Sequence, residues 1–184
     1  MMVPKQAKKV FSGKIFDIYQ WEQEQFDGTF ATFEMLKRPN TLQVIPVMGD
    51  TILLSDEEQP LKDPFISFFG GRQEPNETPL EGIKREFLEE TGMVADEWEL
   101  YKTYMPISKM EWEVYIYIAR GCRKVQDTAL ESGERITIKP VSFEEFVSFV
   151  SSGDFWGKEL MIDVMQMQQH SGDIEKFRNT IFGT

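Results

Sequence analysis

The sequence predicts an α/β fold in which a mixed sheet carries helices on its faces and a small antiparallel sheet comes first. Two observations support this prediction. Strand-like segments lie before and after one strongly marked helix, residues 79–91, and further helical segments follow. The length of 184 residues suits one domain with a good core, alone or with a small appendage. We expect residues 1–40 to form an N-terminal β-ribbon and residues 41–184 to form the main domain.

The first strands are expected within residues 10–38. Asp27-Gly28 is a strong hairpin signal, and residues 29–38 return as a strand that Pro39 ends, because proline cannot continue a ladder. A ribbon of this size is marginal alone. It therefore needs a partner surface on its own domain or on another subunit.

Residues 41–56 predict two further strands around a tight turn at Gly49-Asp50. Both strands are apolar on each face, which is typical of central strands covered on both sides. The remaining elements follow from the same patterns: strands near 98–105, 111–121 and 134–141, a polar connection over 122–133, a helix capped by Ser142 and Glu145, and helices near 157–169 and 173–181.

The helix over residues 79–91 has complete end signals. Thr78 suits the N-cap, Pro79 suits the first helical position, and Glu81 completes a capping box. Gly92 is a natural stop after the last turn. One side of the helix is apolar and should pack on a core; it comprises Leu80, Ile83, Phe87 and Leu88.

Three glutamates share a stripe of this helix. Glu86 and Glu90 are four residues apart, and Glu89 follows Glu86 by three, so their side chains project from one surface. A cluster of carboxylate oxygens on a rigid helix is what hard divalent cations such as Mg²⁺ require. The alternative is a solvated acidic face. The glycine pair at 70–71 and the spacing favour the cation site.

The stretch Gly71–Met93 resembles the Nudix box, G-x5-E-x7-R-E-U-x-E-E-x-G-U, in which U is a bulky aliphatic residue. The two U positions hold Phe87 and Met93, which are apolar but not aliphatic residues of the usual kind. All the fixed residues of the box occur in register: Gly71, Glu77, Arg85, Glu86, Glu89, Glu90 and Gly92.

The Nudix resemblance implies a three-layer α/β/α sandwich over roughly residues 41–170. The additional N-terminal strands resemble those of the ADP-ribose and nucleoside-diphosphate-sugar pyrophosphatase branch. In that branch the N-terminal sheet helps to build the dimer and the substrate site. We therefore expect a homodimer that uses residues 10–38.

The expected reaction is hydrolysis of a pyrophosphate bond by metal-activated water, with Mg²⁺ as the cofactor and Mn²⁺ as a possible substitute. Glu86 and Glu90 are the first candidate ligands, and Glu89 is a third ligand or a proton acceptor. The resemblance adds the backbone carbonyl of Gly70 as a ligand. It also implies a further metal-binding glutamate before the last strand, which would be Glu134.

Supporting and catalytic roles are expected for several other residues. Arg85 is expected to orient a carboxylate with Glu77 as its partner, and the two can equally be a structural ion pair. Gly71, Glu77 and Gly92 are expected to be structural. The family branch places a base in the loop before the last strand, where Glu131 is the candidate; an exposed loop carboxylate is the alternative.

Two arginines are the candidate residues for contacts with the substrate. Arg72 could meet a phosphate, and Arg38, at the end of the N-terminal strands, could reach a neighbouring site; ordinary surface positions are the alternative for both. Many relatives carry an arginine in the segment equivalent to residues 54–60, where this chain has Gln59 and no basic residue. This departure weighs against a strict ADP-ribose assignment.

Composition excludes some classes of function. The net charge of −11 and a pI near 4.7 argue against a nucleic-acid surface. No apolar run is long enough to span a bilayer, and the N-terminal lysines lack a following apolar region of a signal peptide. Cys122 is the one cysteine, so no internal disulfide forms and the reducing cytoplasm is the expected location.

Three functions remain. The leading one is cleavage of a nucleoside diphosphate linked to another moiety, with ADP-ribose or a nucleotide sugar giving a nucleoside monophosphate and a sugar phosphate. The second is a nucleoside triphosphate pyrophosphatase that sanitises nucleotides. The third is a non-catalytic Nudix domain that senses a nucleotide, against which the intact set of box carboxylates speaks.

Overall fold

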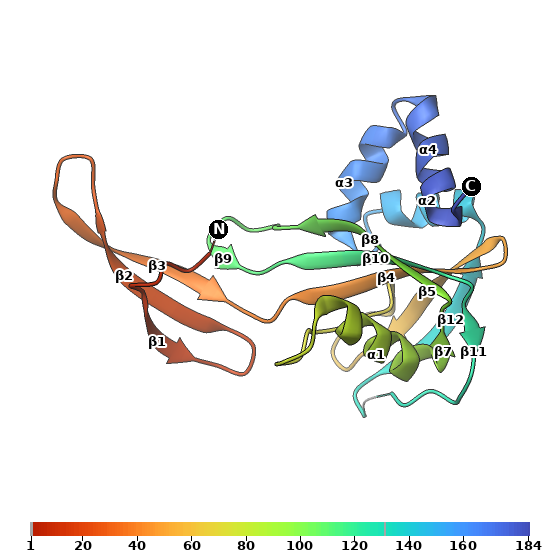
Figure 1. Cartoon of the computed structure of the whole chain (residues 1–184), viewed down its shortest axis with the longest axis horizontal. Helices are drawn as coiled ribbons and strands as arrows, with labels where there is room; N and C mark the ends of the chain where they lie inside the picture. Colours follow the sequence, from red (N-terminus) through yellow and green to blue (C-terminus); the bar gives the residue numbers. More distant parts are fainter. Residues whose placement is uncertain (1, 131) are drawn as a thin grey trace.

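The computed structural model describes residues 2–130 and 132–184, which form an α/β body with an N-terminal sheet extending to one side (Figure 1). The helix of residues 79–91 covers one face of the central sheet, and the helices within residues 143–182 cover the opposite face (Figure 1). This is the expected three-layer sandwich. The strands are β1 (Lys8–Ser12), β2 (Asp17–Glu24), β3 (Phe30–Lys37), β4 (Thr41–Met48), β5 (Thr51–Glu58), β6 (Phe65–Ser67), β7 (Met93–Val94), β8 (Glu97–Tyr104), β9 (Met110–Glu111), β10 (Val114–Arg120), β11 (Arg123–Lys124) and β12 (Arg135–Val141). The helices are α1 (Pro79–Thr91), α2 (Phe143–Ser151), α3 (Lys158–Met167) and α4 (Ser171–Phe182).

The main sheet is mixed, with the strand order β12-β5-β4-β10-β8. β10 runs parallel to β4, and the other neighbours along this path are antiparallel. β4 and β5 pair only beside their turn, at Val47–Ile52 and Met48–Thr51. The segment 65–72 enters the space between them: β6 pairs with β5, and Phe69 then bridges to Val44 on β4. This segment carries the glycine pair into the middle of the sheet.

The N-terminal sheet has the order β1-β2-β3-β9. β2 and β3 form the expected hairpin around Asp27-Gly28, and the hairpin reaches well beyond the body (Figure 1). β9 lies after residue 40 and pairs with β3, so this sheet combines strands from both of the expected segments.

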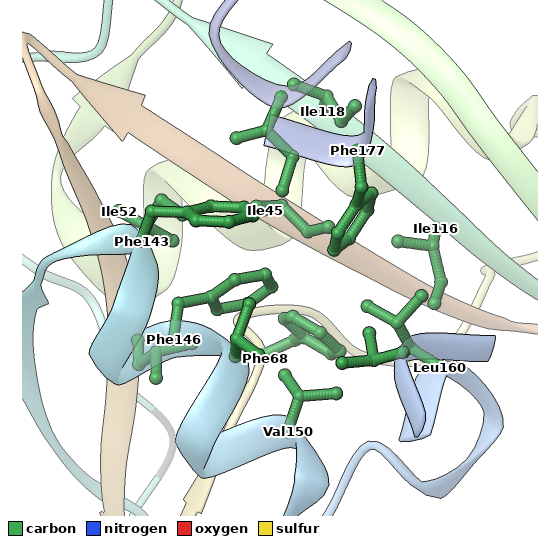
Figure 2. Close-up of a cluster of buried hydrophobic side chains, with 14 of the residues drawn as sticks. Ile45, Ile52, Phe68, Ile116, Ile118, Phe143, Phe146, Val150, Leu160 and Phe177 are labelled. Atoms are coloured by element: carbon green, nitrogen blue, oxygen red, sulfur yellow. The ribbon is translucent and has the colours of Figure 1, made fainter. Parts of the chain in front are cut away.

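Two apolar clusters fill the sandwich, one on each face of the sheet. Adjacent residues of a strand point to opposite faces. Phe68 therefore packs among α2, α3 and α4 with residues such as Phe146 and Phe177 (Figure 2), whereas Phe69 packs against Phe87 of α1. Residues of β4 likewise divide between the two clusters, which confirms that β4 is apolar on both faces because both faces are covered.

Several predicted bounds were wrong. The strand expected over 111–121 divides into β9 and β10, because the N–H of Glu113 donates to the Asn40 side chain (3.0 Å) at the change of partner strand. The connection over 122–133 contains β11, which pairs with β7. Within the described residues, no helix combines the length and apolar character needed to cross a membrane.

Candidate functional site

The site is built on α1, whose ends have the expected caps. Thr78 Oγ1 accepts from the N–H of Glu81 (3.3 Å), and Glu81 Oε2 accepts from the N–H of Thr78 (2.8 Å). Gly92 has a φ of 68° and donates its N–H to the Leu88 carbonyl (2.8 Å). A left-handed residue at this place suits glycine, which has no Cβ to strain. Both ends fix the helix and therefore the direction of its glutamates.

The glycine pair passes very close to the carboxylates of α1. Gly70 has a φ of 136°, and any Cβ there would collide with the carbonyl oxygen of Leu42. Its N–H donates to Oε2 of Glu90 (2.7 Å). A Cβ on Gly71 would lie 2.6 Å from Oε1 of Glu86. Only glycines let the backbone run between β4 and α1 at this distance.

Arg85 is the centre of an ion-pair network on the same helix. Its Nη2 and Nε donate to the two oxygens of Glu77, at 2.9 and 3.2 Å. Its Nη1 donates to Glu86 (3.0 Å) and to Glu89 (3.1 Å). Hydrogen bonds from Arg85 hold the pKa of Glu77 below its usual range. The planar guanidinium thus fixes three carboxylates in place, which a flexible lysine would not do.

Carboxylates of the cavity raise one another's pKa values. The charges of Glu57, Glu86 and Glu134 raise the pKa of Glu90, and the charge of Glu134 also raises the pKa values of Glu57 and Glu86. Glu90 is 7% exposed, and burial raises its pKa well above the usual value, although the Gly70 N–H partly opposes this. Burial also raises the pKa values of Glu86 and Glu57. Ionised carboxylates so placed are destabilised by desolvation and by repulsion.

Such a donor set fits a divalent cation by its charge and its oxygen chemistry, since a bound cation would relieve both costs. In the part of the chain that the structure describes, no three acidic, histidine or cysteine side chains already form a metal-binding group. Glu86 and Glu89 are instead turned toward Arg85. The cation's ligands would therefore be completed by rotation of these side chains.

A cavity of about 630 Å³ brings nearly all the predicted site residues together. Arg38 and Arg72 both line it, and the guanidinium of Arg38 lies 4.7 Å from the centre of the Trp112 ring. Burial and the charge of Arg72 lower the pKa of Arg38. The predicted residues that line the cavity are Arg38, Gly70, Gly71, Arg72, Arg85, Glu86, Glu89, Glu90 and Glu134.

Two predicted residues, Glu77 and Gly92, do not line the cavity. Glu77 accepts two hydrogen bonds from Arg85 and so fixes the position of the guanidinium. Gly92 is the C-cap residue of α1. Glu131, the candidate base, lies outside the residues that the structure describes.

Sequence reasoning missed a polar patch on the β4–β5 side of the cavity. Glu57 is 8% exposed and accepts a hydrogen bond from Ser55 Oγ (2.6 Å). Gln43 is also 8% exposed, and its Oε1 has no hydrogen-bond partner among the described residues. Gln43 interrupts an apolar strand, and that was the signal that could have found it, whereas Glu57 lies in the polar run 55–58 and is not marked in this way. Trp156, which also lines the cavity, carried no such signal.

Three comparisons with known proteins each find similar proteins. A sequence model of a family described as NUDIX domain matches residues 37–162. The ADP-ribose pyrophosphatase of Bacillus subtilis (strain 168) is 23% identical over 165 residues, which cover 88% of this chain and 89% of that protein. A solved structure of an ADP compounds hydrolase has a TM-score of 0.71 and 18% sequence identity, covering 90% of this chain and 91% of the other, and thus a similar fold.

Proposed function

Because the chain belongs to the NUDIX domain family and is a Nudix hydrolase, we propose that it cleaves the pyrophosphate bond of a nucleoside diphosphate linked to another moiety. ADP-ribose and nucleotide sugars are the leading substrates, and the products are a nucleoside monophosphate and a sugar phosphate. The observation that carries the proposal is one cavity that holds buried carboxylates beside two arginines. The named activity of the Bacillus subtilis relative supports the choice of substrate.

Mg²⁺ is the proposed cofactor, with Mn²⁺ as a substitute, held by Glu86, Glu90, Glu134 and the carbonyl of Gly70. When bound, such an ion polarises phosphate oxygens and lowers the pKa of bound water. The chain's own contribution is to place the ligands. The Gly70 N–H holds one oxygen of Glu90 (2.7 Å), and Arg85 holds Glu86 (3.0 Å).

Proton transfer and substrate orientation fall to other residues. Glu89 is half exposed and held by Arg85 at 3.1 Å, so it has a fixed oxygen and access to water. We assign Glu89 as the proton acceptor, and Glu131 is the alternative base. Arg38 and Arg72 present two positive charges to the cavity and would bind the phosphates and orient them toward the carboxylates.

We also propose a homodimer through the N-terminal sheet. Its strands and turns expose large apolar side chains, among them Val10 (52%), Phe11 (57%) and Phe30 (64%). A second copy of the chain would cover such a surface. Arg38 follows β3 directly, so assembly through residues 1–40 would also fix one wall of the substrate site. Light scattering at micromolar concentration tests this, and a monomeric mass would refute it.

The reaction is tested by incubating the protein and Mg²⁺ with ADP-ribose, nucleotide sugars and nucleoside triphosphates, with phosphate release coupled to a phosphatase. We expect turnover of the linked diphosphates, with no turnover after chelation of the metal. Turnover of triphosphates alone would assign the protein to nucleotide sanitising instead. Binding of a nucleotide without turnover of any compound at micromolar enzyme would make it a sensor.

A further inference from the structure

An exposed indole ring forms part of the cavity wall on the side of β5 and β6. Trp156 is 55% exposed although it lines a cavity, and its ring centre lies 5.1 Å from that of Phe65, at an angle of 40°. Covering a large aromatic side chain removes much apolar surface from water, so an indole ring left 55% exposed in a cavity is a feature of ligand sites.

The backbone holds this indole in a fixed place. The N–H of Trp156 donates to the carbonyl of Ile66 in β6 (2.9 Å). The preceding residue, Phe155, is 1% exposed and packs edge-on against Phe68, with ring centres 4.9 Å apart. The indole ring is therefore exposed although the backbone that carries it is held by a hydrogen bond and by the buried side chain of Phe155.

Polar groups surround the aromatic pair. The Lys62 ammonium lies 4.9 Å from the ring centre of Trp156 and 5.3 Å from that of Phe65. It also donates to Oε1 of Gln59 (2.7 Å). Glu159, in the first turn of α3, lines the same cavity. A ligand ring here would meet aromatic faces together with donors and an acceptor at its edge, as a nucleobase requires.

The carboxylates lie between this wall and the arginines. The segment 65–72 runs through the cavity with Phe65 at its start and Arg72 at its end, and Gly70, between them, contacts Glu90. A diphosphate at the carboxylates therefore has space on each side. At one end of the segment the charge of Arg72 acts on Arg38, which lies over the Trp112 ring, and at the other end Phe65 lies against Trp156. The volume of about 630 Å³ is in the ordinary range for small-ligand sites.

We propose that the wall formed by Trp156, Phe65 and Lys62 binds a planar heteroaromatic ring on the second moiety of the substrate. The preferred substrate class is then a dinucleotide, which has a ring beyond each phosphate, over a diphosphate that ends in a sugar. This inference rests on the proposed hydrolysis for the reaction that the bound substrate undergoes. Binding of a ring at this wall can be measured without any reaction.

The test uses two ligands that differ by one ring. Methylene-bridged analogues of nicotinamide adenine dinucleotide and of ADP-ribose resist hydrolysis, and calorimetry with Mg²⁺ gives their dissociation constants. We expect the wild-type protein to bind the dinucleotide analogue about ten-fold more tightly, because stacking of a base on an aromatic side chain has an effect of this size. Trp156→Ala should remove this preference, and Trp156→Phe should retain most of it.

A matched control is Ile162→Ala, which removes a side chain of α3 that is 60% exposed and does not line the cavity. This variant should keep the preference. Equal binding of the two analogues by the wild-type protein overturns the proposal, and so does an unchanged preference in Trp156→Ala. Far-ultraviolet circular dichroism checks that each variant is folded.

Hydrolysis of unmodified ADP-ribose is measured in parallel, so that the two proposals can fail separately. Turnover of ADP-ribose without a ring preference would leave the hydrolase proposal standing and overturn the ring site. A ring preference without turnover of any linked diphosphate would do the reverse.

Discussion

Replacing Gly71 with alanine is expected to disable the carboxylate cluster while leaving the protein folded. The added Cβ would lie 2.6 Å from the Glu86 carboxylate, whereas ordinary contacts of a Cβ begin at 3.4 Å. Relief of the clash requires the carboxylate to move by about 0.8 Å, the difference between these two distances. The added Cβ also takes up space beside Glu86, through which the carboxylate would rotate from Arg85 toward a cation, and ligand distances in metal sites are held to within about 0.2 Å; we therefore expect Glu86 to be lost as a ligand.

The same change should have little effect on stability. Displacing Glu86 weakens its hydrogen bond to Arg85 (3.0 Å), which contributes about 1 kcal/mol or less because the Arg85 side chain is 32% exposed. Alanine in turn restricts the unfolded chain, which stabilises the fold by about 0.4–1 kcal/mol where the backbone suits alanine. Gly71 is not among the residues with a positive φ, so the backbone conformation that most strains alanine does not occur there. The free energy of unfolding should therefore change by less than about 1 kcal/mol.

The assay is a Mg²⁺ titration of turnover, with thermal unfolding of the metal-free protein beside it. For Gly71→Ala we expect the Mg²⁺ concentration that gives half-maximal turnover to rise by about ten- to a hundred-fold, and the midpoint temperature to stay within a few degrees. The control is Gly172→Ala in α4, where an added Cβ meets no atom within 4 Å. Wild-type Mg²⁺ dependence in Gly71→Ala would refute the assignment of Glu86.

Three further substitutions test the network. Glu90→Gln should keep the fold and lower turnover by orders of magnitude, because a neutral amide holds Mg²⁺ poorly; steady-state kinetics check this. Glu77→Gln should lower the free energy of unfolding in urea by about 1–2 kcal/mol, since it removes the charge that faces the partly exposed Arg85 fork; an unchanged midpoint would contradict it. Burial raises the pKa of Glu57 above 4.5, so the folded protein holds this proton longer than the unfolded chain and the metal-free protein loses stability as pH rises through that window. Glu57→Gln should flatten this loss of stability with rising pH, whereas Glu58→Gln, at an exposed neighbour, should not.

The sequence predicted α1 and its surroundings well because the signals there are local. Caps at Thr78 and Gly92 depend on neighbours within one turn, and the spacing of Glu86 and Glu90 puts both on one surface wherever the helix packs. The order of strands and helices, which also rests on local signals, predicted a sheet with helices on its faces. The β3–β9 pairing could not be predicted, since it joins residues far apart in the chain through only two paired positions.

The polar residues on the β4–β5 side of the cavity could not be predicted, because their burial depends on contacts between segments that are separate in the sequence. Gln43 and Glu57 belong to strands that pair only near their turn and then move apart around the segment 65–72. Their burial beside Glu90 follows from that separation, which no local pattern encodes. Trp156 reaches the same cavity from the chain between α2 and α3, through one backbone hydrogen bond to β6.

The missing arginine near Gln59 has a physical counterpart in the structure. The sequence shows no basic residue over 54–60, yet Lys62 lines the cavity just beyond that segment. Leu61 has a φ of 65°, and the N–H of Lys62 donates to the Gln59 carbonyl (3.2 Å), so the chain turns back on itself. The turn places the Lys62 ammonium 2.7 Å from the Gln59 side chain. A positive charge is therefore present on this side of the cavity, as the Lys62 ammonium over the Trp156 ring. An ammonium cannot form the bidentate hydrogen bonds that an arginine makes with a phosphate. That difference favours recognition of a ring over a phosphate at this wall, in keeping with the dinucleotide preference that the Trp156 variants test.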